Sequence, residues 1–330
     1  MLPPRAARPA LAGDVAVDYA VVGAGYTGLA AARRLHELDP KARIAVLEAT
    51  TVGEGASARN SGFTTPVVLP RTASVATAEK ERSQTRLFTE AFEWLQGILR
   101  QDGIECDMQK AGSIRAAATA NGEAVLRRLA AVARINGLTH TILDGADIRD
   151  RIGADYYRYG IHLHDTWLLQ PASLIRGLAD RLPAAISLYE ATPVRALRRE
   201  GRDWRLDTPG GAVTCRTVVA ATNGFIAKLG YLGSRMATIY TYAAITEAMQ
   251  EADADKLGRS PHWGLLPAHR LGTTLRRVGR DRLMVRSLYA HEREIAPDAV
   301  ERELRDRFER RWPALRHVRF EHVWGGASPT

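Results

Sequence analysis

A glycine-rich turn between a predicted strand and a predicted helix constrains the fold of this chain more than any other feature. The turn lies in the stretch VVGAGYTGLAAARRL, where Gly23, Gly25 and Gly28 form the pattern G-x-G-x-x-G. The first glycine allows a tight turn, the second lets a pyrophosphate approach the backbone, and the third lets the helix pack close to the strand. Free N–H groups of the first helical turn, which holds Tyr26 and Thr27, would then face the phosphates of a nucleotide.

The sequence after this helix supplies the second part of a nucleotide-binding unit. An apolar run over residues 42–49 predicts a second strand, so that strand, helix and strand form one βαβ crossover. Glu48 closes this strand, 20 residues after Gly28. A carboxylate at this point accepts both ribose hydroxyls of an adenosine and repels a 2′-phosphate, which disfavours NADP. These motifs leave NAD and FAD open, with an ordinary βαβ turn as the structural alternative.

The charge of the chain argues against a nucleic-acid-binding protein. The 330 residues carry a net charge of +9, but the densest basic stretch, residues 270–319, also contains many acidic residues. Mixed charges of this kind are typical of a solvated helix face. The charge pattern therefore disfavours binding to nucleic acid, although a basic chain can favour an anionic cofactor or substrate through its overall field.

The cysteines and the start of the chain indicate a cellular compartment. Cys106 and Cys215 have no metal-ligand spacing, so we expect neither a metal site nor a disulfide framework. Residues 1–16 have no signal-peptide pattern, and no apolar run is long enough for a membrane span. A cytoplasmic protein fits these features best. We expect the Pro/Ala-rich residues 1–16 to lie over the surface or to be disordered.

A second glycine-rich stretch, GEGASARNSGF over residues 53–63, decides between the two cofactors. Small residues let such a loop wrap a pyrophosphate, and Arg59 supplies a cation with planar donors, unless it is a surface arginine paired with a carboxylate. The stretch resembles the loop G-A-S-x-R-N-x-G in the glycine oxidase and D-amino-acid oxidase family of flavoproteins. This resemblance implies non-covalent FAD as the cofactor. The loop residues that it assigns to FAD are Gly55, Ala56, Ser57, Arg59, Asn60, Ser61 and Gly62.

The same resemblance extends over nearly the whole chain, from Asp18 to Gly326, and is closest to the gamma-glutamylputrescine-oxidase-like branch of bacterial amine oxidases. ATPVRAL, with Val194, matches the strand that meets the adenine, and RTVVAATNGF, with Thr222, matches the strand that ends beside the flavin. The resemblance and the order of predicted elements imply a mixed α/β fold, in which a Rossmann-like FAD/NAD(P)-binding domain carries an inserted, mostly antiparallel substrate domain. The expected boundaries are 17–80 and 150–230 for the FAD-binding domain, and 81–149 and 231–322 for the substrate domain.

The resemblance also implies an activity, the oxidation of an amine or amino acid to an imine with electron transfer to oxygen or another acceptor. The cofactor carries this chemistry and the protein orients the substrate, so we assign no catalytic side chain. Arginines on late strands would bind a carboxylate bidentately, although tyrosines also fill sheets and arginines also cover surfaces. Tyr240 and Tyr242 alternate onto one face of the predicted strand that ends before Glu247. The candidate substrate-binding residues are Tyr240, Tyr242, His269, Arg276 and Arg286.

Two alternative functions stay open on the sequence. Members of the family continue past the Trp-Gly strand with a further glycine-rich segment and a helix, whereas this chain ends at WGGASPT. One alternative is therefore an inactive remnant, with the C-terminal part of the FAD-binding domain missing, that still holds the ADP half of FAD. The other is a flavoenzyme acting on modified tRNA, whose phosphate contacts would weaken with salt.

Overall fold

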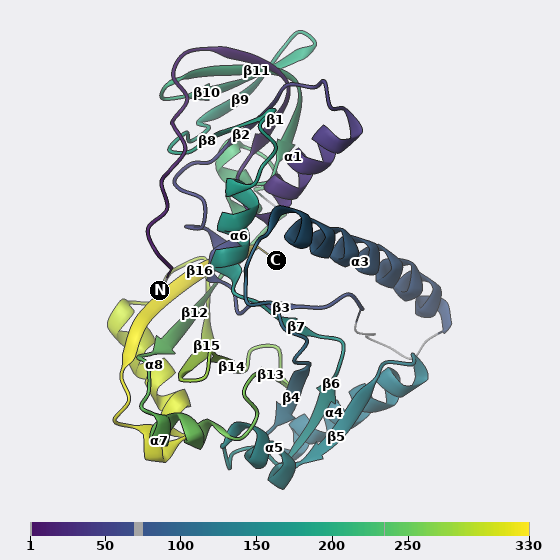
Figure 1. The fold of residues 1–330 in the computed structure, drawn as a ribbon, viewed down its shortest axis with the longest axis vertical. Helices are drawn as coiled ribbons and strands as arrows, with labels where there is room; N and C mark the ends of the chain where they lie inside the picture. The colour runs from purple at the N-terminus through teal and green to yellow at the C-terminus, as the bar shows by residue number, and fades with distance from the viewer. Residues whose placement is uncertain (1, 69–74, 234, 330) are drawn as a thin grey trace.

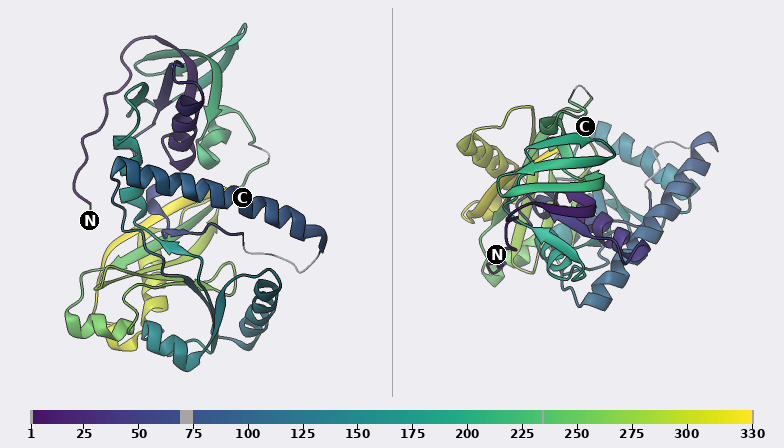
Figure 2. Two further views of the ribbon diagram at one scale, coloured as in Figure 1. Left: turned by 45° about the vertical axis from the view of Figure 1, so that its right-hand side comes forward. Right: turned by 90° about the horizontal axis from the view of Figure 1, so that it is seen from above.

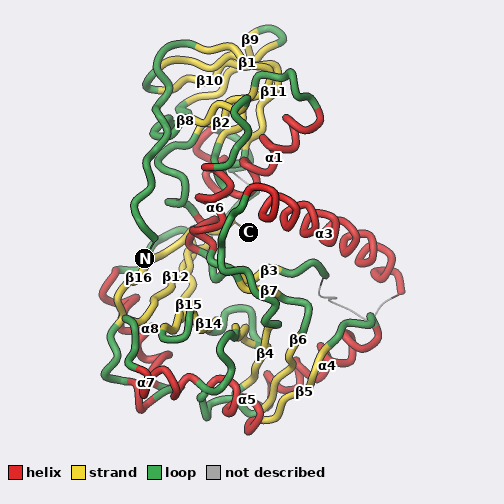
Figure 3. The backbone as a smooth tube through the Cα atoms, viewed as in Figure 1, coloured by secondary structure: helices red, strands yellow, loops and turns green. Residues whose placement is uncertain are grey.

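The computed structural model describes residues 2–68, 75–233 and 235–329, which form two sheet-based parts (Figure 1). The upper part in Figure 1 contains a six-stranded sheet and the lower part an eight-stranded sheet. Helix α3 (Val75–Asp102) crosses between the two parts, as the rotated views in Figure 2 also show. A short two-stranded sheet, β3 (Phe63–Thr64) with β7 (Trp167–Leu168), also lies between the upper and lower parts (Figure 3).

The upper sheet combines parallel and antiparallel strands. In chain order, its strands are β1 (Val15–Val22), β2 (Ile44–Leu47), β8 (Ile186–Tyr189), β9 (Ala196–Glu200), β10 (Asp203–Thr208) and β11 (Gly211–Ala220). Their order in the sheet is β8-β2-β1-β11-β10-β9, and the first four of these run parallel to one another. All four residues of β2 are buried, as is typical of a parallel strand covered on both faces.

Two helices cover one face of the upper sheet. Leu29 and Ala32 of α1 (Tyr26–Leu38) pack with Ile175 of α6 (Pro171–Asp180) against the strands. Proline opens α6 because the first helical position needs no N–H donor. The opposite face packs against side chains that include Leu11, which precedes β1 and is only 3% exposed.

The lower sheet is antiparallel except for the pair β13–β4. Its order is β16-β12-β15-β14-β13-β4-β6-β5. The strands are β4 (Ser113–Ala117), β5 (His140–Asp144), β6 (Tyr159–Leu163), β12 (Thr238–Thr246), β13 (Gly264–Pro267), β14 (Thr274–Val278), β15 (Arg282–His291) and β16 (Phe320–Pro329).

A large apolar core lies on one face of the lower sheet. Helix α8 (Pro297–Glu309) contributes Val300, Leu304 and Phe308, which share one helical face at a spacing of four residues, and Trp312 packs beside them. The remaining helices are α2 (Ala56–Arg59), α4 (Ala120–Ile135), α5 (Gly145–Ile152), α7 (Glu251–Ala254), η1 (Asn223–Leu229), η2 (Asp255–Leu257) and η3 (Pro313–Leu315).

The observed architecture confirms the predicted mixed α/β fold with a mostly antiparallel second sheet. Strand β6 lies in the lower sheet, although its residues fall within the range 150–230 predicted for the FAD-binding domain. Strand β16 extends the lower sheet beyond residue 322. The domain boundaries themselves stay a prediction. Within the described part of the chain, no helix combines the length and the apolar character that crossing a membrane requires.

Replacing Gly28 with alanine is expected to destabilise the protein strongly. The new Cβ would lie 1.8 Å from the carbonyl oxygen of Gly23, and backbone at this point has no room to move. We expect a loss in the free energy of unfolding above about 3 kcal/mol, the upper end of overpacking costs. Chemical denaturation of the purified variant measures this loss.

Gly97→Ala is the matched control, because nothing lies within 4 Å of the added Cβ at this position in the C-terminal part of α3. Alanine is a better helix former than glycine by about 1 kcal/mol, so this variant is expected to be neutral or slightly stabilised. Equal stability of the two variants would contradict the packing argument.

Candidate functional site

The turn between β1 and α1 has the geometry that a nucleotide cradle needs. Gly23 has a φ of +100°, and a Cβ there would lie 2.7 Å from the carbonyl oxygen of Ala221. Gly25 is the N-cap of α1 and offers no side-chain cap to the helix. The first turn of α1 therefore offers backbone N–H donors and the positive end of the helix dipole, both of which favour a phosphate.

The two glycine-rich stretches meet at this helix end. The hydroxyl Oγ of Ser57 accepts a hydrogen bond from the backbone N–H of Tyr26 at 3.1 Å, and it lies 3.0 Å from a Cβ added to Gly25. The Tyr26 hydroxyl donates to the carbonyl of Pro171, and burial raises the pKa of this phenol to about 12. Thr27, by contrast, is exposed in the first turn.

Glu48 lies at the carboxyl end of β2, beside the same turn. Its Oε2 accepts from the backbone N–H of Ala24 at 2.9 Å, and its Oε1 accepts from the N–H of Thr50 at 3.2 Å. Backbone hydrogen bonds to Tyr189 and Thr192 fix its main chain. The carboxylate is thus held next to the glycine turn, at the position where an adenosine ribose is expected.

The loop over residues 53–63 forms the short helix α2 and then turns sharply. Gly55 is the N-cap of α2 and Ala56 its first residue, and both are exposed. The Asn60 amide caps the last turn of α2 by donating to the carbonyl of Ser57 at 2.7 Å and accepts from the N–H of Gly62 at 2.8 Å. Gly62 then adopts a φ of +74°. These contacts stabilise the turn that follows α2.

Arg59 joins this loop to the lower sheet. Its guanidinium pairs with Glu54 at 3.0 Å and donates to the carbonyl of Gly325, while the Trp324 indole donates to the Arg59 carbonyl at 3.1 Å. The predicted phosphate-binding cation therefore has a carboxylate partner here, which was the alternative that the sequence left open for this residue.

Arg276 makes a second, buried connection between the loop and the lower sheet. Only 4% of the residue is exposed, and its Nη1 donates to the carbonyls of Ser61, at 3.1 Å, and Leu169, at 2.5 Å. Its Nε is buried without a partner in the described structure. Burial lowers the pKa of this guanidinium, and the charge of Asp107 only partly opposes the effect.

The other two predicted cofactor residues lie at the ends of neighbouring segments. Thr222 follows β11 and lies beside Gly23, and its hydroxyl is buried without a partner in the described structure. Val194 is partly buried between β8 and β9, two residues after Thr192, whose N–H donates to the Glu48 carbonyl. Both positions border the carboxyl ends of the parallel strands, where nucleotides bind in such sheets.

The two predicted tyrosines lie on the far face of the lower sheet. Tyr242 belongs to the core beneath α8, and its hydroxyl accepts from the N–H of Ile295 at 2.6 Å. Tyr240 shares this face and packs against the same core. They do share a face, as predicted, but the face points away from the loop, so we do not carry them into the proposed site.

The opposite face of the lower sheet points towards the loop, and we call it the loop face. Trp324 and Gly326 identify it, because both reach Arg59. Strand pairing places Thr241 opposite Gly326, and Ala243 between Trp324 and Arg286. The side chains that strand pairing places on the loop face include Thr241, Thr274, Arg276, Arg286 and Trp324.

Arg286 is one of the cations of the loop face. It is partly buried, its guanidinium lies 5.6 Å from the centroid of the Tyr289 ring, and it has no carboxylate partner among the described residues. Thr241 carries a buried hydroxyl without a partner in the same described set. Sequence reasoning missed Thr241, because a threonine in a strand carries no signal of its own.

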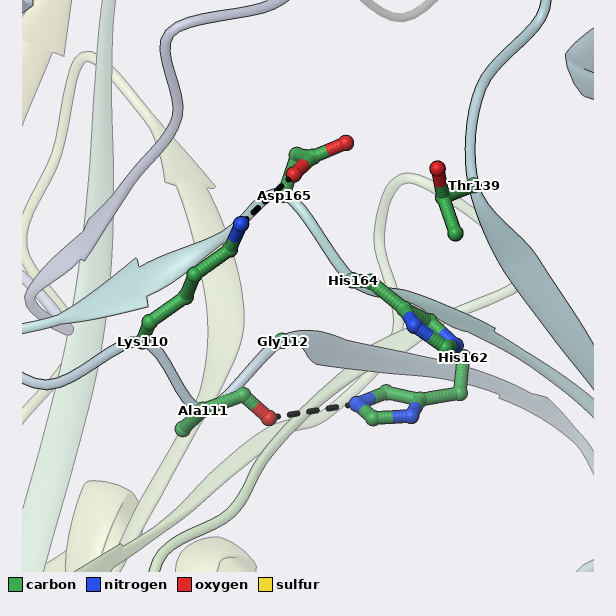
Figure 4. Close-up of a pocket in the computed structure, with 7 residues that line it drawn as sticks. All are labelled: Lys110, Ala111, Gly112, Thr139, His162, His164 and Asp165. Carbon is green, nitrogen blue, oxygen red and sulfur yellow. Dashed lines mark hydrogen bonds and ion pairs between the residues drawn. The ribbon is translucent and has the colours of Figure 1, made fainter.

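The remaining candidate residue and a hollow in the lower part lie elsewhere. His269 is exposed in the turn between β13 and β14, where its Nδ1 accepts from the N–H of Leu271. A hollow of about 360 Å³ beside β6 is lined by His162 and His164, with Lys110 paired to Asp165 at its edge (Figure 4). Burial lowers the pKa of His162, which favours the neutral form of this imidazole. None of the predicted site residues lines it.

The residues around the glycine turn fit the ADP half of a dinucleotide. A helix start with glycine as its N-cap, two glycines that tolerate no Cβ, and a hydroxyl that is buried without a partner in the described structure surround the turn. A carboxylate stands at the strand end where a ribose would lie. No group of side chains in the described part of the chain is suited to holding a metal ion.

Comparison with known proteins agrees with this geometry. The model of a family described as FAD dependent oxidoreductase matches residues 18–330. The chain is 28% identical over 234 residues to a probable oxidoreductase OrdL of Rhizobium meliloti. This alignment covers 69% of this chain and 54% of that protein. It is 24% identical over 328 residues to the gamma-glutamylputrescine oxidoreductase of Escherichia coli, and the alignment covers 95% of this chain and 74% of that protein. The chain therefore spans about half the length of the Rhizobium relative.

Solved structures show the same fold. Glycine oxidase from Geobacillus kaustophilus superposes with a TM-score of 0.78 at 21% sequence identity, covering 96% of this chain and 83% of that chain. At this identity the similarity establishes the arrangement of the two sheets.

Arg276→Met is expected to destabilise the protein by about 2–6 kcal/mol, because the carbonyls of Leu169 and Ser61 lose their donor and each unsatisfied group costs about 1–3 kcal/mol. Denaturant unfolding without added cofactor measures the change. Arg280→Met is the control, since the Arg280 side chain is exposed and only its carbonyl accepts hydrogen bonds. Equal stability of both variants would remove Arg276 as a connection between the loop and the sheet.

Proposed function

Because the chain belongs to the family of FAD-dependent oxidoreductases, we propose that it oxidises an amine or an amino acid to an imine with non-covalent FAD. The electrons would pass to oxygen or another acceptor. The observation that carries this proposal is the meeting of the two glycine-rich segments at Tyr26 and Ser57, directly opposite a sheet face with an unpaired arginine. Two similar proteins named above are an oxidoreductase of gamma-glutamylputrescine and an oxidase of glycine, and both names denote compounds that contain nitrogen.

The upper sheet supplies the residues that would hold the ADP half of FAD. The first turn of α1 would bind the pyrophosphate through backbone N–H groups, and Glu48 would accept hydrogen bonds from the ribose. Thr222 has a free hydroxyl beside the turn. The residues proposed for cofactor binding are Gly23, Gly25, Tyr26, Thr27, Gly28, Glu48, Gly55, Ala56, Ser57, Arg59, Asn60, Ser61, Gly62, Val194 and Thr222.

The loop face would bind the substrate. When bound, the flavin supplies the acceptor for a hydride from the carbon next to nitrogen. The chain's own contribution is to orient the substrate and exclude water from it. Arg286 would bind a carboxylate through two parallel N–H donors, and Thr241 would offer a hydroxyl from the neighbouring strand. Arg276 would act on the cofactor loop through the carbonyls it binds and would not contact substrate.

Titration of the purified chain with FAD tests the cofactor assignment. Glu48→Gln is expected to weaken FAD binding about 10- to 100-fold, because hydrogen bonds to a charged group contribute about 1.5–3 kcal/mol. Glu303→Gln is the control, since Glu303 pairs only with Arg307 on the exposed side of α8. Folded wild-type protein that binds no FAD would remove the proposed function altogether.

Arg286→Met tests the substrate side. With amino acids and their decarboxylated amines compared in an assay of peroxide release or dye reduction, KM is expected to rise about 10- to 100-fold for amino acids alone. The amines lack the carboxylate and would be unaffected. Arg293→Met, at an exposed position, is the control. A variant in which both classes of substrate change equally would contradict the role of Arg286.

A further inference from the structure

The segment before β1 is tied to the upper sheet by a buried carboxylate. We call residues 2–13 the N-terminal arm; they form the purple segment along the outer edge of the upper part in Figure 1. Glu190, at the end of β8, is fully buried, with 0% of its surface exposed. Nη1 of Arg5 donates to both of its oxygens at 2.8 Å, and the backbone N–H of Arg8 donates to Oε2.

The arm also makes contacts outside this carboxylate. Nε of Arg5 pairs with Asp180 at 2.6 Å, and the N–H of Leu11 donates to the Thr192 hydroxyl at 3.0 Å. Pro3 accepts from Arg176 through its carbonyl. The arm therefore contacts the region around the carboxyl end of β8 through several residues. A flexible tail would not make such a series of contacts.

Glu190 is held in its charged form by the same contacts. Burial alone would raise its pKa, but hydrogen bonds from the backbone of Arg8 and Val52 and from the Arg5 side chain outweigh it and lower the pKa. Removing Arg5 would leave this buried charge without its cation, which is a severe defect in a protein interior. The arm and Glu190 are thus energetically dependent on each other.

The other side of Glu190 faces the segment that follows Glu48. Its Oε1 accepts from the backbone N–H of Val52 at 2.6 Å. The carbonyl of Thr50 accepts from the N–H of Ala191 at 2.7 Å, and the N–H of Thr50 donates to the Glu48 carboxylate. A continuous chain of hydrogen bonds thereby links the arm, Glu190, residues 50–52 and the side chain of Glu48.

We propose that the N-terminal arm is a working part of the adenosine site: through Arg5 and Glu190 it fixes residues 50–52, and these orient the Glu48 carboxylate for the ribose. Glu190 is a positioning residue, because it acts through the backbone of Val52 and Thr50 and does not itself contact the Glu48 carboxylate. The inference rests on the proposed function, since Glu48 needs an adenosine to bind. It assigns a role to a segment outside the βαβ unit.

The test measures how tightly the Arg5→Met variant binds FAD and ADP, at a temperature well below the unfolding temperature of the variant. The expected result is binding at least tenfold weaker than wild type, by the same factor for both ligands, because Glu48 is placed at the half that they share. Arg8→Ala is the control. It keeps the backbone N–H that reaches Glu190 and loses only an exposed side chain, so its affinities should stay within twofold of wild type.

Hydrogen exchange of the Val52 amide without ligand supplies a second readout, and we expect faster exchange in Arg5→Met than in Arg8→Ala. Should the Met variant fail to fold, Arg5→Lys keeps the charge but loses the paired donors, and an intermediate affinity would support the proposal. Unchanged FAD and ADP affinity in a folded Arg5 variant would overturn it, as would a loss confined to FAD. Wild-type protein that binds neither ligand would instead overturn the proposed function and this inference with it.

Discussion

The buried contact between Arg276 and the loop carbonyls is the interaction on which the relation of the two sheets depends. Arg276 belongs to β14 of the lower sheet, yet its guanidinium binds Ser61 in the loop that follows the upper sheet's first βαβ unit. A Cβ on Gly62 would lie 2.1 Å from the same guanidinium, so only glycine permits this approach. The loop is therefore fixed by two contacts: Ser57 binds the start of α1, and Arg276 of the lower sheet binds the Ser61 carbonyl.

Two buried charges are stabilised in different ways around this site. Glu190 has a full set of donors, including a cation, whereas Arg276 is bound by neutral carbonyls and keeps its Nε unpartnered. A charge with neutral partners in a protein interior is strongly affected by any negative group placed near it. The positive charges at Arg276 and Arg286 thus favour an anionic cofactor or substrate between the two sheets, in agreement with the FAD-dependent family.

Much of the cofactor side could be predicted because its chemistry depends on local spacing. Gly23, Gly25 and Gly28 are close in sequence, and the strand and helix around them bring Glu48 alongside without further information. The substrate side could not be predicted in the same way. Alternation showed that Tyr240 and Tyr242 share a face, but the packing of α8 decides which face that is. Thr241 and Glu190 gave no signal, because only burial makes their polar atoms significant.

The sequence by itself determined the mixed α/β class, the glycine turn with Glu48 beside it, and the preference for FAD, since each follows from residues within one local segment. The tertiary structure alone decided that Arg59 pairs with Glu54, that Arg276 binds the loop, and that Arg286 faces it without a carboxylate partner among the described residues. It alone also placed the N-terminal arm against Glu190. The physical reason is distance along the chain: Arg5 and Glu190 are 185 residues apart, and no local pattern encodes a contact that only folding brings together.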